Sequence, residues 1–205
     1  MSTSDPRATV SIGQELTGRG IAYIDAPVMG GVLFAQDASL DVLVGGDNAH
    51  IDRCLPLFMA MARQVFRCGP LGSAHSLKLL ANYINASTLV IILEAMAIGS
   101  KFGLDIQCMT DGLISMCSGR QHPLETKIVP QVLTRTFASG MALGLLAKDV
   151  GLAADFTQAM GSTSALVNCV RQIWADAEAK MGATADHTEI VKVWEEAIGV
   201  KLKCD

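Results

Sequence analysis

A lysine and an asparagine stand four residues apart in an otherwise apolar stretch of this chain. Lys78 and Asn82 are separated by two leucines and an alanine, and Leu77 precedes them. Side chains four apart on a helix lie on one face, so both could reach the same point. An unpaired ammonium among apolar side chains is costly and its pKa is readily displaced, which suits proton exchange with a substrate. Considered alone, such a lysine more commonly extends its ammonium to solvent.

A glycine turn follows the first apolar run of the chain. Residues 25–31 read D-A-P-V-M-G-G. The backbone N–H groups of Gly30 and Gly31, free of Cβ crowding, can approach and bind a carboxylate. Met29 adds apolar bulk and at best a weak acceptor. A strand end with an ordinary turn has the same residues, so this run alone leaves both interpretations open.

The first part of the chain, 1–71, alternates helix and strand signals. Ser4 can cap a short helix with Pro6 in its first turn, and Gly18 and Gly20 end it. Asp47 can cap a second helix that runs to about residue 62. Runs of β-branched and aliphatic residues closed by glycines predict strands of a covered sheet. The predicted strands are 21–28, 40–46 and 64–68. The expected fold class of this part is α/β.

The second part, 72–205, has helical periodicity, helix-forming residues and almost no strand signals. The helix predicted over 73–102 far exceeds the ~11–12-residue mean of soluble domains, so we expect it to be the spine of an all-helical domain. Ser162 or Thr163 can cap a later helix, and Asp186 with Glu189 resembles a capping box. The further predicted helices are 105–118, 121–134, 141–160, 163–181 and 187–199.

The composition excludes several classes of partner and location. A net charge of −4 in 205 residues gives no basic surface of the kind that nucleic acid requires. The longest apolar stretch is interrupted by asparagines, so we expect no membrane span. The start of the chain shows no secretory signal, which predicts a cytoplasmic location. The six cysteines are expected to be free thiols, and His50 with Cys54 lacks the second ligand pair that a metal site needs.

A dinucleotide site needs a glycine turn at a helix N-terminus to approach the pyrophosphate. No G-x-G-x-x-G follows a strand anywhere in this sequence. We therefore expect the chain as given to bind a dinucleotide weakly or not at all.

Four segments, in this order, resemble the β-hydroxyacid dehydrogenase family, which includes 3-hydroxyisobutyrate dehydrogenase and tartronate semialdehyde reductase. They cover nearly the whole chain, and independent coincidences do not fall in this order. Residues 2–6 are similar to the family's S-T-x-x-P turn, and 25–31 to its D-A-P-V-S-G-G loop. Residues 69–82 resemble its G-x-G-x-x-x-K-x-x-N-N motif, and 137–149 its F-x-x-x-L-x-x-K-D-L segment.

The resemblance implies an NAD(P)-dependent oxidoreductase that transfers hydride between a small β-hydroxyacid and the nicotinamide. It makes Lys78 the catalytic acid and base, with no metal. The implied fold is the end of a Rossmann-type domain, without its dinucleotide-binding half, followed by a helical domain like the C-terminal domain of 6-phosphogluconate dehydrogenase. The family's helical domains pair around the long helix, so a homodimer or larger assembly is implied. The implied substrate-binding residues are Met29, Gly30, Gly31 and Asn82, and the cofactor-binding residues Thr3 and Lys148.

The sequence departs from the family pattern at several positions. Met29 replaces a serine that supplies a hydroxyl to the substrate, and the changes elsewhere are at Phe34, Ala38, Ser39, Ala74 and Ala81. These departures leave open an alternative, a truncated non-catalytic relative that serves as an oligomerisation or interaction module. The retained Lys78, Asn82, Lys148 and Thr3 favour the enzyme. Neither the hydroxyacid nor the choice between NAD and NADP follows from this sequence.

Overall fold

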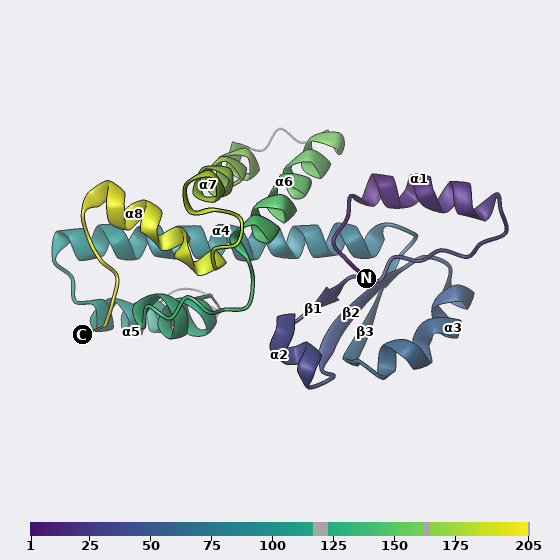
Figure 1. The fold of residues 1–205 in the computed structure, drawn as a ribbon, viewed down its shortest axis with the longest axis horizontal. Helices are drawn as coiled ribbons and strands as arrows, with labels where there is room; N and C mark the ends of the chain where they lie inside the picture. Colours follow the sequence, from purple (N-terminus) through teal and green to yellow (C-terminus); the bar gives the residue numbers. More distant parts are fainter. Residues whose placement is uncertain (117–122, 162–164, 205) are drawn as a thin grey trace. The chain divides into compact units, whose positions relative to one another are not determined.

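The computed structural model describes residues 1–116, 123–161 and 165–204, which form two compact units (Figure 1). The first unit comprises Met1–Asn82 and Leu152–Thr163, and the second Tyr83–Gly151 and Ser164–Asp205. The change of pattern at residue 72 coincides with the start of helix α4 (Ser73–Phe102). Because α4 contributes to both units, the domain boundary at residues 71 and 72 stays a prediction.

A three-stranded sheet in the order β1-β2-β3 lies in the first unit (Figure 1). β1 runs antiparallel to β2, and β2 runs parallel to β3 with helix α3 as the crossover between them. Ile51 and Phe58 of α3 share a buried cluster with Val42 and Val44 of β2. The α/β prediction for this part is confirmed. The elements are β1 (Val28–Met29), β2 (Leu40–Gly45), α3 (Asn48–Met59) and β3 (Ala62–Gly69).

The strand predicted at 21–28 is largely wrong, whereas those at 40–46 and 64–68 are confirmed. Only Val28 of that run belongs to β1, and an isolated bridge joins Asp25 to Gly45. Pro27 interrupts the ladder because it has no N–H to donate, although its carbonyl accepts the N–H of Leu43 at 3.0 Å. A short helix that the sequence analysis missed, α2 (Gly31–Gln36), follows the turn directly.

Helix α1 (Pro6–Thr17) is capped by Asp5, so the predicted cap at Ser4 is wrong. The Asp5 carboxylate accepts the N–H of Arg7 at 2.8 Å. A proline disfavours helical backbone in the residue before it, and Asp5 takes the extended conformation that a cap requires. The predicted cap of α3 is confirmed, because the Asp47 carboxylate accepts the N–H of Ala49 at 2.8 Å.

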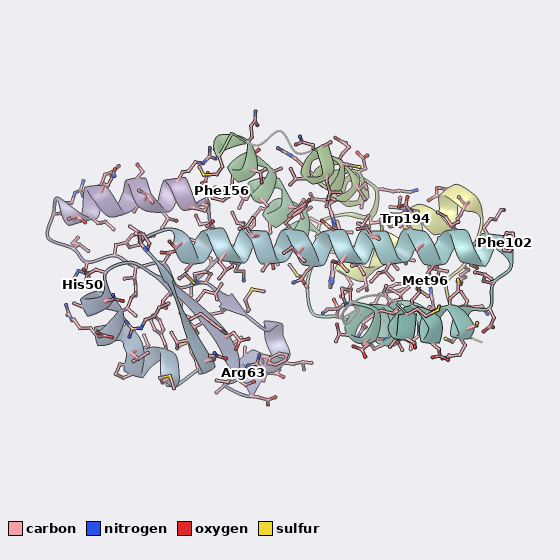
Figure 2. The ribbon with its side chains drawn as sticks, turned by 180° about the vertical axis from the view of Figure 1, so that it is seen from behind. His50, Arg63, Met96, Phe102, Phe156 and Trp194 are labelled. Carbon is pink, nitrogen blue, oxygen red and sulfur yellow. The ribbon has the colours of Figure 1, made fainter. Side chains whose placement is uncertain are left out.

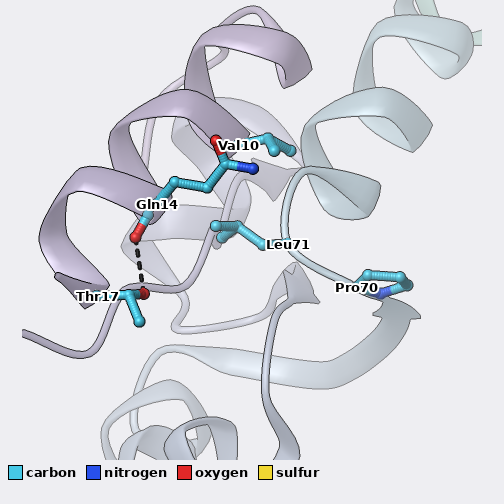
Figure 3. Close-up of a pocket in the computed structure, with 6 residues that line it drawn as sticks. Val10, Gln14, Thr17, Pro70 and Leu71 are labelled. Atoms are coloured by element: carbon cyan, nitrogen blue, oxygen red, sulfur yellow. Dashed lines mark hydrogen bonds between the residues drawn. The ribbon is translucent and has the colours of Figure 1, made fainter.

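Helix α1 lies close to the turn that leads into α4. A Cβ built at Gly13 would stand 2.1 Å from Cδ2 of Leu71, so a larger residue at this position would require the Leu71 side chain to move. A hollow of about 430 Å³ beside this contact is lined by Val10, Gly13, Gln14, Thr17, Pro70 and Leu71 (Figure 3). Its lining has no ionisable side chain and therefore offers no group for proton transfer.

Helices account for nearly all of the second unit, which confirms the predicted all-helical part with a long central helix. Trp174 of α7 and Met96 of α4 are fully buried in its core, and Trp194 of α8 is nearly so (Figure 2). The helices after α4 are α5 (Ile106–Met116), the π-helix Leu124–Leu133, α6 (Leu143–Ala159), α7 (Ala165–Met181), the 3₁₀-helix His187–Ile190 and α8 (Val191–Ile198).

Two of the predicted helices differ in type from the expectation. Within the segment predicted at 121–134, Leu124–Leu133 is a π-helix, and Pro130 inside it cannot donate the N–H that an unbroken α-helix needs. The segment predicted at 187–199 divides into a 3₁₀-helix and α8. The predicted capping box of Asp186 and Glu189 is confirmed at its start. The predicted cap at Ser162 or Thr163 lies outside the described residues.

Within the described part of the chain, α4 is the one helix long and apolar enough to cross a membrane by length and composition. Half of its most apolar window is buried inside the protein. The central helix of a packed domain has the same character, so its composition gives weak support for a membrane span. The five described cysteines, Cys54, Cys68, Cys108, Cys169 and Cys204, are free thiols.

A buried histidine makes the second unit sensitive to acid. His187 is 4% exposed, and burial, aided by the charge of Lys127, lowers its pKa from 6.5 to about 4 despite the nearby Asp186. The unfolded chain therefore binds more protons than the folded chain between these values. The free energy of unfolding therefore carries no penalty from His187 above about pH 6.5. As the pH falls towards 4, this group lowers the free energy of unfolding by at most ~3 kcal/mol.

We expect His187→Asn to flatten this dependence. Urea unfolding at pH 7 and at pH 5 should show a smaller loss of unfolding free energy in the variant than in the parent chain, by about 2 kcal/mol. Gln158→Asn on the exposed side of α6 is the control, because it replaces no ionisable group, and it should leave the difference between the two pH values unchanged. Equal losses in His187→Asn and the parent chain would contradict the assignment.

Candidate active site

The first unit brings Lys78 against the glycine turn. Lys78 lies in the second turn of α4, and its ammonium donates a hydrogen bond to the backbone carbonyl of Val28. Val28 is followed by Met29, Gly30 and Gly31, three of the four residues predicted to bind the substrate. A group that can carry a proton thus lies next to a glycine turn. The chemical roles of these residues stay predictions.

Both glycines of the turn are required by their backbone conformation. Gly30 has a φ of 120° and Gly31 a φ of 74°, a region that L side chains rarely adopt. A Cβ built at Gly30 would also stand 2.8 Å from Cβ of Phe34 and 3.0 Å from its Cγ. Phe34 therefore packs directly on the turn, at a position where the resembled family usually has glycine.

The Phe34 side chain is held over the turn by a charged pair. The guanidinium of Arg63 lies 5.7 Å from the centre of the Phe34 ring. Its Nε and Nη2 donate hydrogen bonds to the Asp41 carboxylate, each at 2.8 Å. These hydrogen bonds lower the pKa of Asp41. Asp41 is also the partner of Met29 in the β1–β2 ladder. This support lies mainly on the surface, with Phe34 41% exposed.

At the end of α2, Ala38 has the left-handed backbone conformation that glycine usually adopts. Ala38 has a φ of 51°, and the N–H of Ser39 closes the helix end on the carbonyl of Phe34 at 2.8 Å. Left-handed backbone costs an L-residue about 1 kcal/mol or more, and glycine is the preferred residue at this point of a helix end.

We therefore expect Ala38→Gly to stabilise the chain by about 1 kcal/mol, because it relieves this strain. Urea unfolding measures the change. The matched control is Ala35→Gly inside the same helix, which should destabilise by about 0.5–1 kcal/mol. Destabilisation by both substitutions would show that the strain at Ala38 is absent.

The other predicted site residues divide between the two units. Asn82 is 8% exposed and lies one helical turn after Lys78, in the same unit. Thr3 belongs to that unit also, half-buried before α1. Lys148 lies on α6 in the second unit, with its side chain half exposed and 3.3 Å from Oδ1 of Asp149. The predicted meeting of Lys148 with a cofactor stays a prediction.

Sequence reasoning missed two buried polar residues beside the site. The fully buried carboxylate of Asp25 accepts the N–H groups of Gly72 and His75, each at 2.8 Å. The ring of His75, only 6% exposed, contacts the hydroxyl of Thr9 and the carbonyl of Ser2. A carboxylate inside the apolar run 21–28 was the available signal, because a buried charge requires partners.

Metal chemistry has no evident centre in the described residues, among which no group of three or more histidine, cysteine or acidic side chains could hold an ion. His50 and Cys54, four apart on α3, remain without further ligands.

Family profiles match both parts of the chain. One, described as the NAD-binding domain of NADP-dependent 3-hydroxyisobutyrate dehydrogenase, matches residues 72–194. The chain belongs to the β-hydroxyacid dehydrogenase family. A second profile, the NAD-binding domain of 6-phosphogluconate dehydrogenase, matches residues 1–69. The resemblance carried by the four sequence segments is thereby confirmed at the level of the family, and NAD(P) is the cofactor of that family.

Several relatives of established name match most of the chain. It is 28% identical to 2-(hydroxymethyl)glutarate dehydrogenase of Eubacterium barkeri, over 98% of this chain and 67% of that protein. It is 34% identical to the NAD-dependent L-serine dehydrogenase of Pseudomonas aeruginosa, over 80% of this chain and 56% of that protein. The chain therefore spans between about half and two thirds of the length of these relatives.

A solved structure supports the fold of the chain. The Mycobacterium tuberculosis 3-hydroxyisobutyrate dehydrogenase with L-serine has a TM-score of 0.78 at 27% identity, covering 94% of this chain and 67% of that one. This similarity confirms the expected fold, a small sheet with helices followed by a helical domain built on a long helix.

Proposed function

We propose that this chain carries the proton-transfer and substrate-binding residues of an NAD(P)-dependent oxidoreductase acting on small β-hydroxyacids. The observation that carries the proposal is the hydrogen bond between the Lys78 ammonium and the carbonyl of Val28, at the glycine turn of a member of this family. In this proposal the ammonium acts on the hydroxyl group of a substrate held by the turn.

In the proposed reaction Lys78 moves the proton and the turn holds the acid. Neutral Lys78 takes the proton of the substrate hydroxyl, and in the reverse direction its ammonium returns a proton to the forming alkoxide. The N–H groups of Gly30 and Gly31 bind the substrate carboxylate, and Asn82 orients the lysine or the substrate. Bound NAD(P) supplies the acceptor of the hydride from the hydroxyl-bearing carbon. Met29, in place of a serine, gives the site an apolar wall.

One end of that cofactor has a proposed contact in the first unit. Thr3 lies before α1 and follows Ser2, whose carbonyl oxygen lies 2.8 Å from Nε2 of His75, three residues before Lys78. Thr3 would contact the nicotinamide, and the contact predicted for Lys148, which belongs to the other unit, stays a prediction. The pyrophosphate end needs a G-x-G-x-x-G turn that this sequence does not contain. We therefore propose weak or no NAD(P) binding by the chain alone.

The family relatives indicate which substrates to test. The names of similar proteins specify 2-(hydroxymethyl)glutarate, L-serine and 3-hydroxyisobutyrate, all small acids with a hydroxyl group. The test uses an extended form of the protein, a chimera in which this chain is joined to the remaining segment of the Eubacterium relative. Reduction of NAD⁺ or NADP⁺ by one of these acids supports the proposal, and no reduction by any of them contradicts it.

One observation favours the alternative of a non-catalytic module. Phe34 packs against Gly30, where it reduces the space available to a substrate carboxylate. The extended form separates the two proposals, because a non-catalytic module would show no turnover with any acid. Phe34→Gly would remove the side chain that packs on Gly30 and leave Lys78 in place. The retained Lys78 and Asn82 support the enzyme.

We also propose a homodimer formed through α4. Within the second unit an apolar stripe runs along the exposed side of this helix, and we call it the α4 stripe. Three isoleucines recur every seven residues, each followed four residues later by another member. This alternating spacing is the pattern by which one helix packs on another of the same kind. The members of the α4 stripe are Ile84, Thr88, Ile91, Ala95, Ile98 and Phe102.

The exposure of the stripe supports a second copy as its partner. Ile84, Ile91 and Ile98 are 61%, 57% and 60% exposed, and Phe102 is 85% exposed. Figure 2 labels Phe102 at the end of α4. Large exposed apolar side chains grouped on one helix are typical of an interface, and Thr88 is the one polar member of the α4 stripe. A second copy presents the same spacing, so the two stripes are complementary to each other.

A further inference from the structure

The N-terminus of α4 is capped from a distant part of the chain. The residue before the helix, Gly72, has no side chain with which to cap it. The Asp25 carboxylate accepts the N–H groups of Gly72 and His75 instead, each at 2.8 Å. Two of the four N–H groups that a helix start leaves unpaired are thereby satisfied. The cap comes from the segment that leads into the glycine turn.

Asp25 is itself fixed in place. Its side chain is fully buried, and its backbone N–H and carbonyl both pair with Gly45, at 3.1 and 2.9 Å. A Cβ built at Gly45 would stand 2.5 Å from Oδ1 of Asp25 and 2.9 Å from the carbonyl oxygen of Pro70. The carboxylate is therefore closely packed against Gly45 and connects the β2 strand with the start of α4.

His75 connects the same point to the start of the chain. Its Nδ1 lies 2.9 Å from the hydroxyl of Thr9 and 3.7 Å from Oδ2 of Asp25. Its Nε2 lies 2.8 Å from the carbonyl oxygen of Ser2, which can only accept, so Nε2 carries a proton. One buried pair thus joins the segment before α1, the segment before the glycine turn and the helix that bears Lys78.

We propose that Asp25 and His75 are positioning residues that set the Lys78 ammonium against the glycine turn. Val28 follows Asp25 by three residues and Lys78 follows His75 by three, so the capping bond and the Lys78–Val28 bond form two successive links between the same two segments. A cap from a residue next to the helix would stabilise α4 without fixing its position relative to the glycine turn. The catalytic meaning of this placement rests on the function proposed above.

The test measures the reactivity of Lys78 in the chain as it exists. Acylation by an N-hydroxysuccinimide ester, followed by peptide mass spectrometry, gives separate rates for Lys78 and for Lys101, the exposed lysine at the other end of α4. Asp25→Asn removes a charge-assisted acceptor, so we expect the Lys78 rate to rise about tenfold while the Lys101 rate stays unchanged. His75→Gln should produce a smaller rise in the same direction.

Asp47→Asn is the matched control, because it removes the charge from the cap of α3, a helix with no predicted site residue, and it should alter neither lysine rate. An unchanged Lys78 rate in both folded variants overturns the proposal. An equal rise at Lys78 and Lys101 overturns it too, since the pair would then stabilise the fold in general. If Asp25→Asn does not fold, His75→Gln decides alone.

This labelling needs neither cofactor nor substrate, so it is independent of turnover. A selective rise at Lys78 in a protein whose extended form reduces no NAD(P) would refute the dehydrogenase and leave the positioning pair intact. Turnover by the extended form with no selective rise would refute the positioning pair alone.

Discussion

Lys78→Ala should lower kcat of the extended form about 10²–10⁴-fold, the usual contribution of a positioned general acid and base. The variant loses the ammonium that donates a hydrogen bond to the carbonyl of Val28 at the glycine turn. The residues proposed to contact the nicotinamide are unchanged. The dissociation constant of NAD(P) should therefore stay nearly the same. Steady-state kinetics and calorimetry on one preparation measure both quantities.

Two further variants make this result specific. Lys78→Arg should not restore turnover, because a guanidinium remains protonated at working pH and cannot serve as the base. Lys101→Ala, on the same helix but at its far end, should leave kcat unchanged. Near-normal turnover in Lys78→Ala or Lys78→Arg would assign the proton transfer to another group.

Ile91→Asp should dissociate the proposed homodimer, with a rise in its dissociation constant of about 100-fold or more. Ile91 is the middle isoleucine of the α4 stripe and is 57% exposed in the single chain, so its replacement should leave the fold of the monomer intact. In the dimer the same carboxylate would be buried without a partner, which is the costly case. Light scattering across micromolar concentrations measures the change.

The matched control for this result is Leu166→Asp, which places the same charge on an exposed leucine of α7 in the same unit. It should leave the assembly as it is. A parent chain with a clean monomer mass and cooperative unfolding would contradict the dimer itself, and an unchanged dimer in Ile91→Asp would move the interface away from the α4 stripe.

The sequence predicted the architecture well wherever a periodic pattern extends over many residues. The thirty residues of α4 and the β-branched runs of β2 and β3 have strong, uninterrupted signals, and the structure has these elements at the expected places. Short and locally ambiguous elements were harder. The helix α2 begins at Gly31 with Gly30 as its N-cap, and Pro27 breaks a run that otherwise has the composition of a strand.

The candidate site was predictable in part for the same reason. Lys78 and the glycine turn carry local patterns, and the structure places them together. Asp25 and His75 act through contacts across 47 to 73 residues of sequence, which no local pattern reports. The replacement at Phe34 was visible in the sequence, but its packing on Gly30 depends on the course of α2 and could be seen only in the structure.

The most direct test of the proposed function follows the hydride itself. The extended form is incubated with NAD⁺ or NADP⁺ and with a candidate hydroxyacid that carries deuterium on its hydroxyl-bearing carbon, and the reduced cofactor is examined by mass spectrometry. The account predicts deuterium in the reduced nicotinamide and, at equal times, very little of that product with Lys78→Ala. Reduced cofactor without deuterium, or equal product from the parent protein and Lys78→Ala, would contradict it.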